Sequence, residues 1–392
     1  DSWGLRSTYN SSFPVEHLFQ IPSGWSGISS FLEPVNPLLS DLMWPVSEQF
    51  NLMLNDQGNI YWPTQGINTL QFWQPSEGYV INMLQIATLP ITGIPIEYPL
   101  VFIDEGWSYI PVLVPEPYPV EVLFQGFEGF VIAKDIAGTG VYWPEYNVNT
   151  LDLFIPGRSY SVLSLQQGEV SFGGLSRDHS TLEIQEHHAK VQTPWNPVFP
   201  TPNSHVIVFN DVGQFFEAGD VVGSFTSDNW CTGIAEIADP NHNFVVTVNG
   251  QAPDGSTSNG FEEGEKIILK LYRPGSGEIF TLSPAYNPRL NTGNYEMDGM
   301  SEIVDLKLSA TGVSGLHKTD IKIYPNPNSG SFYIKGLDEP ITVSIYNSMG
   351  EEVFVESKAG NFNVNLHKHN KGTYYVRINT SGGTFFEKVI VY

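Results

Sequence analysis

Short runs of apolar and β-branched residues, separated at brief intervals by glycine, proline, asparagine and aspartate, dominate the pattern of this chain. Several runs alternate apolar with polar residues, as in Phe50–Leu54 and Gly78–Met83. Such alternation is typical of strands with one buried face. One stretch, 36–44, has helical spacing and should end before Pro45. The pattern therefore predicts a mostly β, multi-domain protein with little helix.

A set of motifs occurs twice, in the same order and at nearly the same offset. Gly24-Trp25-Ser26 returns as Gly106-Trp107-Ser108, and Tyr61-Trp62-Pro63 returns as Tyr142-Trp143-Pro144. Asn68-Thr69-Leu70 and Tyr79 return as Asn149-Thr150-Leu151 and Tyr160. The period, roughly 80 residues, exceeds that of the usual solenoid repeats. We therefore predict two tandem β-rich repeat units with the same strand order, at 19–98 and 99–175, after a lead-in at 1–18.

Further segments follow the repeat. Residues 176–192 are expected to be a polar linker, and 193–312 carry apolar, β-branched runs with short turns between them, which predicts a β-sandwich. A second linker at 313–317 precedes residues 318–392, where the spacing of the runs predicts a small C-terminal antiparallel β-sandwich.

Charge is distributed unevenly along the chain. The 42 acidic and 18 basic residues give a net charge of −24; residues 316–392 carry +1, which leaves −25 for residues 1–315. Such an acidic body repels phosphate backbones and anionic lipid, so nucleic acid and membrane surfaces are not expected partners.

Two further features narrow the class of protein. No apolar run reaches the roughly 18 residues of a membrane span, so the chain is not expected to cross a membrane. Cys231 is the only cysteine, which excludes an internal disulfide. Because the chain opens with Asp1 rather than Met, we expect a processed product or a fragment.

The most specific motifs lie in residues 318–392. Proline fixes the backbone after an apolar strand and stops the strand, and glycine suits turns that need positive φ. The motif residues are Tyr324, Pro325, Asn326, Pro327, Gly330, Gly350, Gly372, Tyr374 and Lys388, the last just before the closing apolar run. In this order and at this end of the chain, they resemble the type A C-terminal sorting domain of the type IX secretion system.

The resemblance implies a Bacteroidota protein that is exported across the outer membrane. The implied partners are the type IX secretion translocon and its sorting machinery. The implied location is the outer cell surface, or the extracellular space, of a Gram-negative bacterium. Such domains are often removed during export, so either the chain is written as its precursor or this protein keeps its tail. The tandem units resemble modules found beside such domains in large surface proteins, and no activity is assigned to them.

Candidate binding residues are few. Trp62, Trp73 and Trp143 are candidates for stacking on a surface glycan, although a tryptophan repeated at one place in two copies is more often core. The acidic, glycine-rich stretch with Asp254, Glu262 and Glu263 is a candidate Ca²⁺ site, since oxygen ligands on flexible turns suit that ion. Its spacing does not match an EF-hand, so the default expectation is no cofactor.

Catalysis finds little support in the sequence. There is no Gly-x-Ser-x-Gly, His-Glu-x-x-His or phosphate-binding loop motif. Cys231 and His205 lie in one predicted domain, where they would serve as nucleophile and base, but a single cysteine of this kind is usually a small buried hydrophobe. His179, His187 and His188 are interpreted as solvated linker residues rather than metal ligands. We therefore expect a protein that is not an enzyme.

The sequence as a whole predicts a secreted or cell-surface structural or adhesive protein, exported by the type IX route and able to self-associate. The alternative is a glycan-binding module, or the C-terminal part of a larger secreted enzyme or adhesin. Self-association would bring basic residues of the tail to acidic residues of the body, Glu262, Glu263 and Glu265. The basic residues are Lys318, Lys322, Lys335, Lys368, Lys371 and Arg377.

Overall fold

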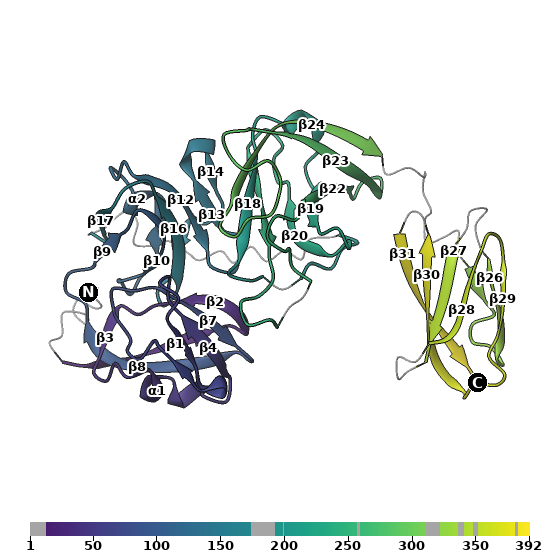
Figure 1. The fold of residues 1–392 in the computed structure, drawn as a ribbon, viewed down its shortest axis with the longest axis horizontal. Coiled ribbons are helices and arrows are strands. Elements are labelled where there is room, and N and C mark those ends of the chain that lie inside the picture. Colours follow the sequence, from purple (N-terminus) through teal and green to yellow (C-terminus); the bar gives the residue numbers. More distant parts are fainter. Residues whose placement is uncertain are drawn as a thin grey trace, which may run out of the picture. The chain divides into compact units, whose positions relative to one another are not determined.

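In a computed structural model, the described residues are 13–173, 193–198, 200–256, 259–310, 322–335, 341–347, 352–380 and 383–392. The chain divides into two compact units, Asp1–Leu308 and Ser309–Tyr392, and each is described by itself. The predicted linkers at 176–192 and 313–317 lie outside the described residues. Both units are built mostly of strands, as the alternating pattern predicts (Figure 1).

The first repeat contains a five-stranded sheet of order β2-β7-β4-β5-β6 and a three-stranded sheet of order β1-β8-β3. The predicted helix at 36–44 is a single turn, α1, followed by a 3-10 turn that contains Pro45. The elements are β1 (Val15–Ile21), β2 (Gly24–Ile28), β3 (Leu32–Pro34), α1 (Leu39–Leu42), η1 (Trp44–Val46), β4 (Phe50–Leu54), β5 (Ile60–Trp62), η2 (Pro63–Gln65), β6 (Ile67–Asn68), β7 (Tyr79–Met83) and β8 (Ala87–Pro95).

The second repeat contains a five-stranded sheet of order β10-β16-β12-β13-β14, with the two-stranded sheets β11-β15 and β17-β9 beside it. Its elements are β9 (Leu100–Ile103), β10 (Gly106–Pro111), β11 (Tyr118–Pro119), α2 (Val120–Leu123), β12 (Phe130–Asp135), β13 (Val141–Trp143), η3 (Pro144–Tyr146), β14 (Val148–Asn149), β15 (Leu153–Phe154), β16 (Ser159–Ser164) and β17 (Gly168–Ser171).

The five-stranded sheets of the two repeats have the same strand order and the same register. Trp25 lies opposite Asn82 in the first, and Trp107 lies opposite Leu163 at the equivalent place in the second. The repeated threonines also make equivalent bonds: Thr69 Oγ1 accepts from the amide of Ile60 at 2.8 Å, and Thr150 Oγ1 accepts from the amide of Val141 at 3.0 Å. The repeated motifs therefore mark positions that close the same turns.

The two repeats meet through a reciprocal pair of close contacts. Gly27 packs on Ser159, where a Cβ atom would lie 2.1 Å from the carbonyl oxygen, and Gly78 packs on Tyr109, where a Cβ would lie 2.8 Å from the backbone. Gly27 and Tyr109 occupy equivalent positions in the two repeats, as do Gly78 and Ser159. Exchanging the repeats therefore turns one contact into the other, which is the property of a two-fold, isologous interface.

Residues 204–310, here called the central domain, form one seven-stranded sheet of order β20-β19-β22-β23-β24-β18-β21. β18 and β24 pair in parallel, and apolar side chains from the strands enclose one core. At Gly233, in the end strand β20, a Cβ would lie 2.0 Å from the carbonyl of Thr247 in the other end strand, β21, so the sheet curls until its two ends meet. The elements are β18 (Ser204–Phe209), η5 (Gly213–Phe215), β19 (Val221–Phe225), β20 (Cys231–Glu236), β21 (Phe244–Asn249), β22 (Ile268–Arg273), β23 (Glu278–Tyr286) and β24 (Met300–Ala310).

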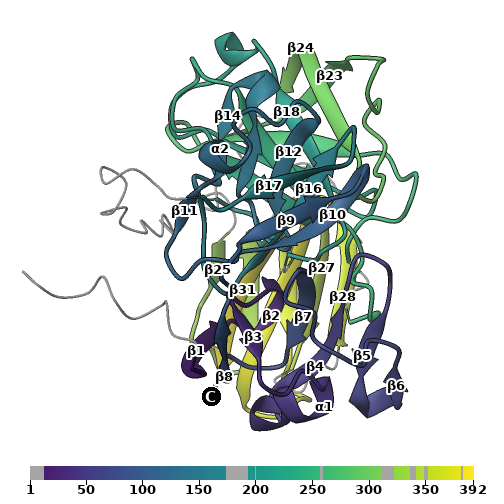
Figure 2. The same ribbon diagram turned by 90° about the vertical axis from the view of Figure 1, so that its left-hand side faces the viewer.

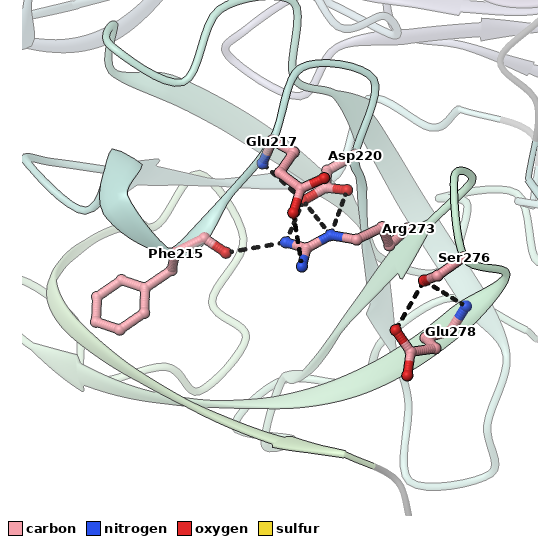
Figure 3. Close-up of polar contacts among 6 residues, drawn as sticks. All are labelled: Phe215, Glu217, Asp220, Arg273, Ser276 and Glu278. Atoms are coloured by element: carbon pink, nitrogen blue, oxygen red, sulfur yellow. Dashed lines mark hydrogen bonds and ion pairs between the residues drawn. The ribbon is translucent and has the colours of Figure 1, made fainter. Parts of the chain in front are cut away.

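An arginine clamp fixes the loop between β18 and β19 to the end of β22 (Figure 3). The guanidinium of Arg273 donates from Nε and Nη2 to the carboxylate of Asp220, at 3.1 and 2.9 Å, and from Nη2 to the carbonyl of Phe215 at 3.3 Å. Glu217 lies 3.1 Å from Nη1. Asp220 is 1% exposed, so its carboxylate is held away from water by this bidentate pairing. The cluster is therefore structural.

The two repeats and the central domain pack side by side into one unit (Figures 1 and 2). Trp143 in the second repeat packs with Val206 and Val208 of β18. A smaller cluster joins Trp25 of the first repeat, Ile136 of the second and Ala252 of the central domain. Apolar contacts therefore cross each of the boundaries between these three domains.

The C-terminal domain is a sandwich of two antiparallel sheets, β25-β26-β29 and β28-β27-β30-β31. Alternate residues of the strands face one shared core, which includes Phe332, Val343, Phe362 and Val376. The strands are β25 (Lys322–Tyr324), β26 (Ser331–Lys335), β27 (Ile341–Tyr346), β28 (Glu352–Lys358), β29 (Phe362–Asn365), β30 (Gly372–Thr380) and β31 (Gly383–Val391).

Candidate functional site

The loop after β25 covers the free edge of the last strand, β31. The side chain of Asn326 bridges two residues of that strand: its Nδ2 donates to the carbonyl of Lys388 at 2.7 Å, and its Oδ1 accepts from the amide of Ile390 at 3.0 Å. The backbone of Asn328 continues the pairing, donating to the carbonyl of Ile390 at 2.9 Å and accepting from the amide of Tyr392 at 3.0 Å. These groups of β31 point away from β30, so the loop closes an edge that would otherwise be open to another strand.

Asn328 and Gly330 explain why the loop needs the residues it has. Asn328 is 1% exposed, and its Oδ1 accepts from the amide of Gly330 at 2.8 Å. Gly330 has φ of 111°, and a Cβ there would lie 2.6 Å from Nδ1 of His367. Glycine is therefore required twice over, by the backbone angle and by the space. Asn328 was not among the residues picked out from the sequence, although it directly follows Pro327.

Other residues of the predicted sorting motif lie in the core, at the start of a strand or on the surface. Tyr374 is buried in the core of the C-terminal domain, and Gly372 begins β30. The side chain of Lys388 is exposed, and what the loop binds is its carbonyl. Gly350 lies outside the described residues.

A polar cavity of about 410 Å³ lies between the second repeat and the central domain. The 3-10 turn η3, which follows Trp143, lines one side, and β24 with the loop before it lines the other. Trp143, Tyr146 and Glu302 are buried at its base, whereas Glu145 and Arg289 are exposed. None of these residues except Trp143 was singled out from the sequence, because the two sides come from segments that are far apart along the chain.

Glu302 is the best-bonded group of this cavity. Its carboxylate accepts from Tyr146 Oη at 2.9 Å, Asn210 Nδ2 at 2.8 Å and Asn287 Nδ2 at 2.5 Å. Burial raises the pKa of Glu302, but the three hydrogen bonds, that from Asn287 first, outweigh burial and lower the pKa below its ordinary value of 4.5. The cavity therefore holds a charged, oriented carboxylate at neutral pH.

Comparison with known protein families identifies the C-terminal domain. Residues 322–392 match the family model described as a secretion system C-terminal sorting domain. The chain carries a type IX sorting domain. It is therefore a substrate of type IX secretion and is exported to the cell surface or the extracellular space. The residues at which the loop covers β31 lie inside the matched segment.

Other comparisons add little to this. No curated protein matches the chain. Among solved structures, the chain is similar to a biofilm associated protein BSP domain, at 8% identity and a TM-score of 0.16, over 100% of this chain and 98% of that one. It is also similar to dimeric latent PorU from Porphyromonas gingivalis, at 12% identity and a TM-score of 0.17, over 97% of this chain and 30% of that one. TM-scores this low carry no argument about fold or function.

The predicted glycan-stacking tryptophans need correction. Trp73 and Trp143 are each 1% exposed, so neither can present a ring face to a sugar. Trp73 packs on Tyr79 in the core of the first repeat, and Trp143 is covered by the central domain. Both are therefore core residues, although only Trp143 has a tryptophan, Trp62, at the equivalent place in the other repeat. Trp62 is half-buried, and its Nε1 donates to Asn51 Oδ1 at 3.2 Å.

The predicted calcium ligands do not converge. Asp254 accepts from the amide and hydroxyl of Ser256, Glu262 from Gln251, and Glu263 from the amide of Met297. Among the described residues, no three histidine, cysteine, aspartate or glutamate side chains form a group that could hold a metal ion. This arrangement does not favour a calcium site. His179, His187 and His188 lie outside the described residues.

Cys231 and His205 have separate partners. The Cys231 thiol donates to the carbonyl of Gly233, and burial raises its pKa to about 11, which disfavours the thiolate. His205 Nε2 lies 2.8 Å from Ser301 Oγ, and its Nδ1 lies 3.2 Å from the carbonyl of Glu296. The nucleophile and base pairing considered from the sequence is therefore not assembled.

Within the part of the chain that the structure describes, no helix is long and apolar enough to cross a membrane. The predicted contact between basic residues of the sorting domain and acidic residues of the body stays a prediction. Glu265 is already engaged within the central domain, where it accepts from the amide and hydroxyl of Ser227. Lys318 lies outside the described residues.

Proposed function

We propose that this protein is a non-enzymatic structural or adhesive component of the cell surface, delivered there by its type IX sorting domain. The observation that carries the proposal is the sorting domain itself, which commits the chain to export. The sorting domain leaves open the role of the first unit, Asp1–Leu308.

The construction of the first unit supports a structural or adhesive role. Its three β domains are joined by apolar clusters and by an ion pair between buried Lys134 and part-exposed Asp298. Lys134 Nζ lies 2.8 Å from Asp298 Oδ1, which links β12 to the loop before β24. Lys134 also donates to Ser204 Oγ at 2.8 Å, and its Nζ lies 4.6 Å from the centroid of the Trp107 ring. Domains fixed to one another in this way suit a protein that presents a surface rather than one that closes around a substrate.

Export is tested by deleting residues 318–392 in the native host. The truncated protein should accumulate in the periplasm, and its normal appearance outside the cell would overturn the assignment of the sorting signal. A finer test compares Gly330→Ala with Gly360→Ala. Both glycines have positive φ, but a Cβ meets His367 only at Gly330, whereas nothing lies within 4 Å at Gly360. We expect Gly330→Ala to lower export more than Gly360→Ala.

The adhesive role is tested with cells that lack the protein. They should attach less well to surfaces and to one another, and the wild-type chain should restore attachment while the chain without residues 318–392 should not. Unchanged attachment in the cells that lack the protein, while wild-type cells export it normally, would contradict the adhesive role and leave the assignment of the sorting domain intact.

A further inference from the structure

The cavity between the second repeat and the central domain has the features of a small-ligand site. Its volume of about 410 Å³ falls in the range of about 300–1,000 Å³ that is usual for such sites. Glu302 and Tyr146 are only 5% and 8% exposed, and we call this buried side of the lining the base of the cavity. Glu145 and Arg289 are exposed, and we call this side the mouth. Apolar side chains of Val131, Leu290 and Met300 complete the lining.

The polar groups of the cavity are only partly used by the protein. Glu302 Oε2 accepts two hydrogen bonds, from Tyr146 and Asn287, but Oε1 accepts one, from Asn210. A carboxylate oxygen has two acceptor positions, so Oε1 keeps one. The exposed guanidinium of Arg289, another lining residue, carries hydrogen-bond donors. The cavity therefore offers both an acceptor and donors to a ligand.

The charges of the cavity select the class of ligand. A phosphate or other dianion would meet Glu145 and the charged Glu302, in a body of net charge −25. A metal ion would find two carboxylates, one of them already bonded to three donors. A neutral polyhydroxyl ligand meets neither obstacle, because each hydroxyl both donates and accepts and can serve Glu302, the asparagine amides and Arg289 together.

We propose that this cavity binds a neutral sugar unit of a surface polysaccharide. The hydroxyl groups would meet Glu302 and Asn287 at the base and Glu145 and Arg289 at the mouth. The C–H faces would pack on Leu290 and Met300. This proposal rests on the proposed adhesive function and gives it a ligand. The sugar would be held by polar groups at the boundary between two domains, whereas the sequence predicted stacking on tryptophan rings.

The test uses the full chain and ligand-observed saturation-transfer NMR with methyl glycosides of glucose, galactose, mannose and N-acetylglucosamine, and their β-linked disaccharides. We expect signal for at least one probe, and Arg289→Ala and Glu145→Gln should each weaken its affinity about tenfold, the effect of one hydrogen bond to a charged group. The matched control is Glu48→Gln, an exposed acid of the first repeat, which should bind as the wild type does.

Two results would overturn the proposal. One is the absence of signal for every probe from folded protein, and the other is equal binding by the wild type and by both variants of the cavity mouth. Both mouth residues are exposed, so loss of the fold is not expected, and equal thermal unfolding of variants and control checks this. If either result is obtained and cells that lack the protein still attach less well, the sugar site is rejected. The adhesive role is then kept.

Discussion

Lowering the pH from 7.5 to 5 should destabilise the first unit through one residue, His205. The ring is 0% exposed, and burial lowers its pKa from 6.5 to about 4, helped by the charge of Lys134 and opposed by the hydrogen bond to Glu296. Between pH 6.5 and 4, the unfolded chain therefore binds a proton at this residue that the folded chain does not. Stability from the neutral ring is fully present above pH 6.5 and is lost as the pH falls.

The size of the effect follows from the two pKa values. Each pH unit below 6.5 costs about 1.4 kcal/mol until the folded-state pKa is reached, so the free energy of unfolding should fall by about 2 kcal/mol between pH 7.5 and 5. A His205→Gln variant cannot take up this proton, yet its amide can still bond to Ser301. Its stability should therefore lack this part of the pH dependence, whatever other groups contribute.

Urea unfolding followed by tryptophan fluorescence is the suitable assay. All nine tryptophans lie at or before Trp230, so the signal reports on the first unit and not on the sorting domain. His242→Gln is the matched control, because the side chain of His242 is 66% exposed. Parallel pH dependences of the free energy of unfolding for the wild type and His205→Gln would refute the reasoning.

Three further predictions concern single contacts. Lys134→Met should lower the free energy of unfolding of the first unit by about 2–3 kcal/mol in the same assay, because it leaves Asp298 without its charged partner. Adding Asp298→Asn to this variant should recover part of the loss. Gly27→Ala should cost about 1–3 kcal/mol, since its Cβ would collide with Ser159, and a neutral result would contradict the close contact between repeats. Asn328→Ala should cost about 1–3 kcal/mol within the sorting domain and speed hydrogen exchange of the amides of β31, whereas unchanged exchange would show that the loop does not hold that strand.

The sequence alone determined the two repeats and the features that depend on local backbone conformation. Motifs that recur in one order at a nearly constant offset indicated two repeats whose sheets share one strand order, because turn residues and buried aromatics act within a few neighbouring strands. The sorting domain was likewise identifiable, since its proline and glycine positions are imposed by local backbone geometry. Gly330 shows this directly, because its φ of 111° favours glycine. The crowding there by His367, 37 residues away, is a tertiary contact.

Only the tertiary structure decided what equivalent residues do. Trp62 and Trp143 stand in the same Tyr-Trp-Pro motif, yet Trp62 is half-buried and Trp143 is fully covered. The difference comes from β18, whose Val206 and Val208 lie against the second repeat. The cavity around Glu302 could not be predicted from the sequence for the same reason. Tyr146, which is distant in the sequence, bonds to Glu302 across a domain boundary. Periodicity records which face of a strand is apolar, but contacts between distant segments decide what that face meets.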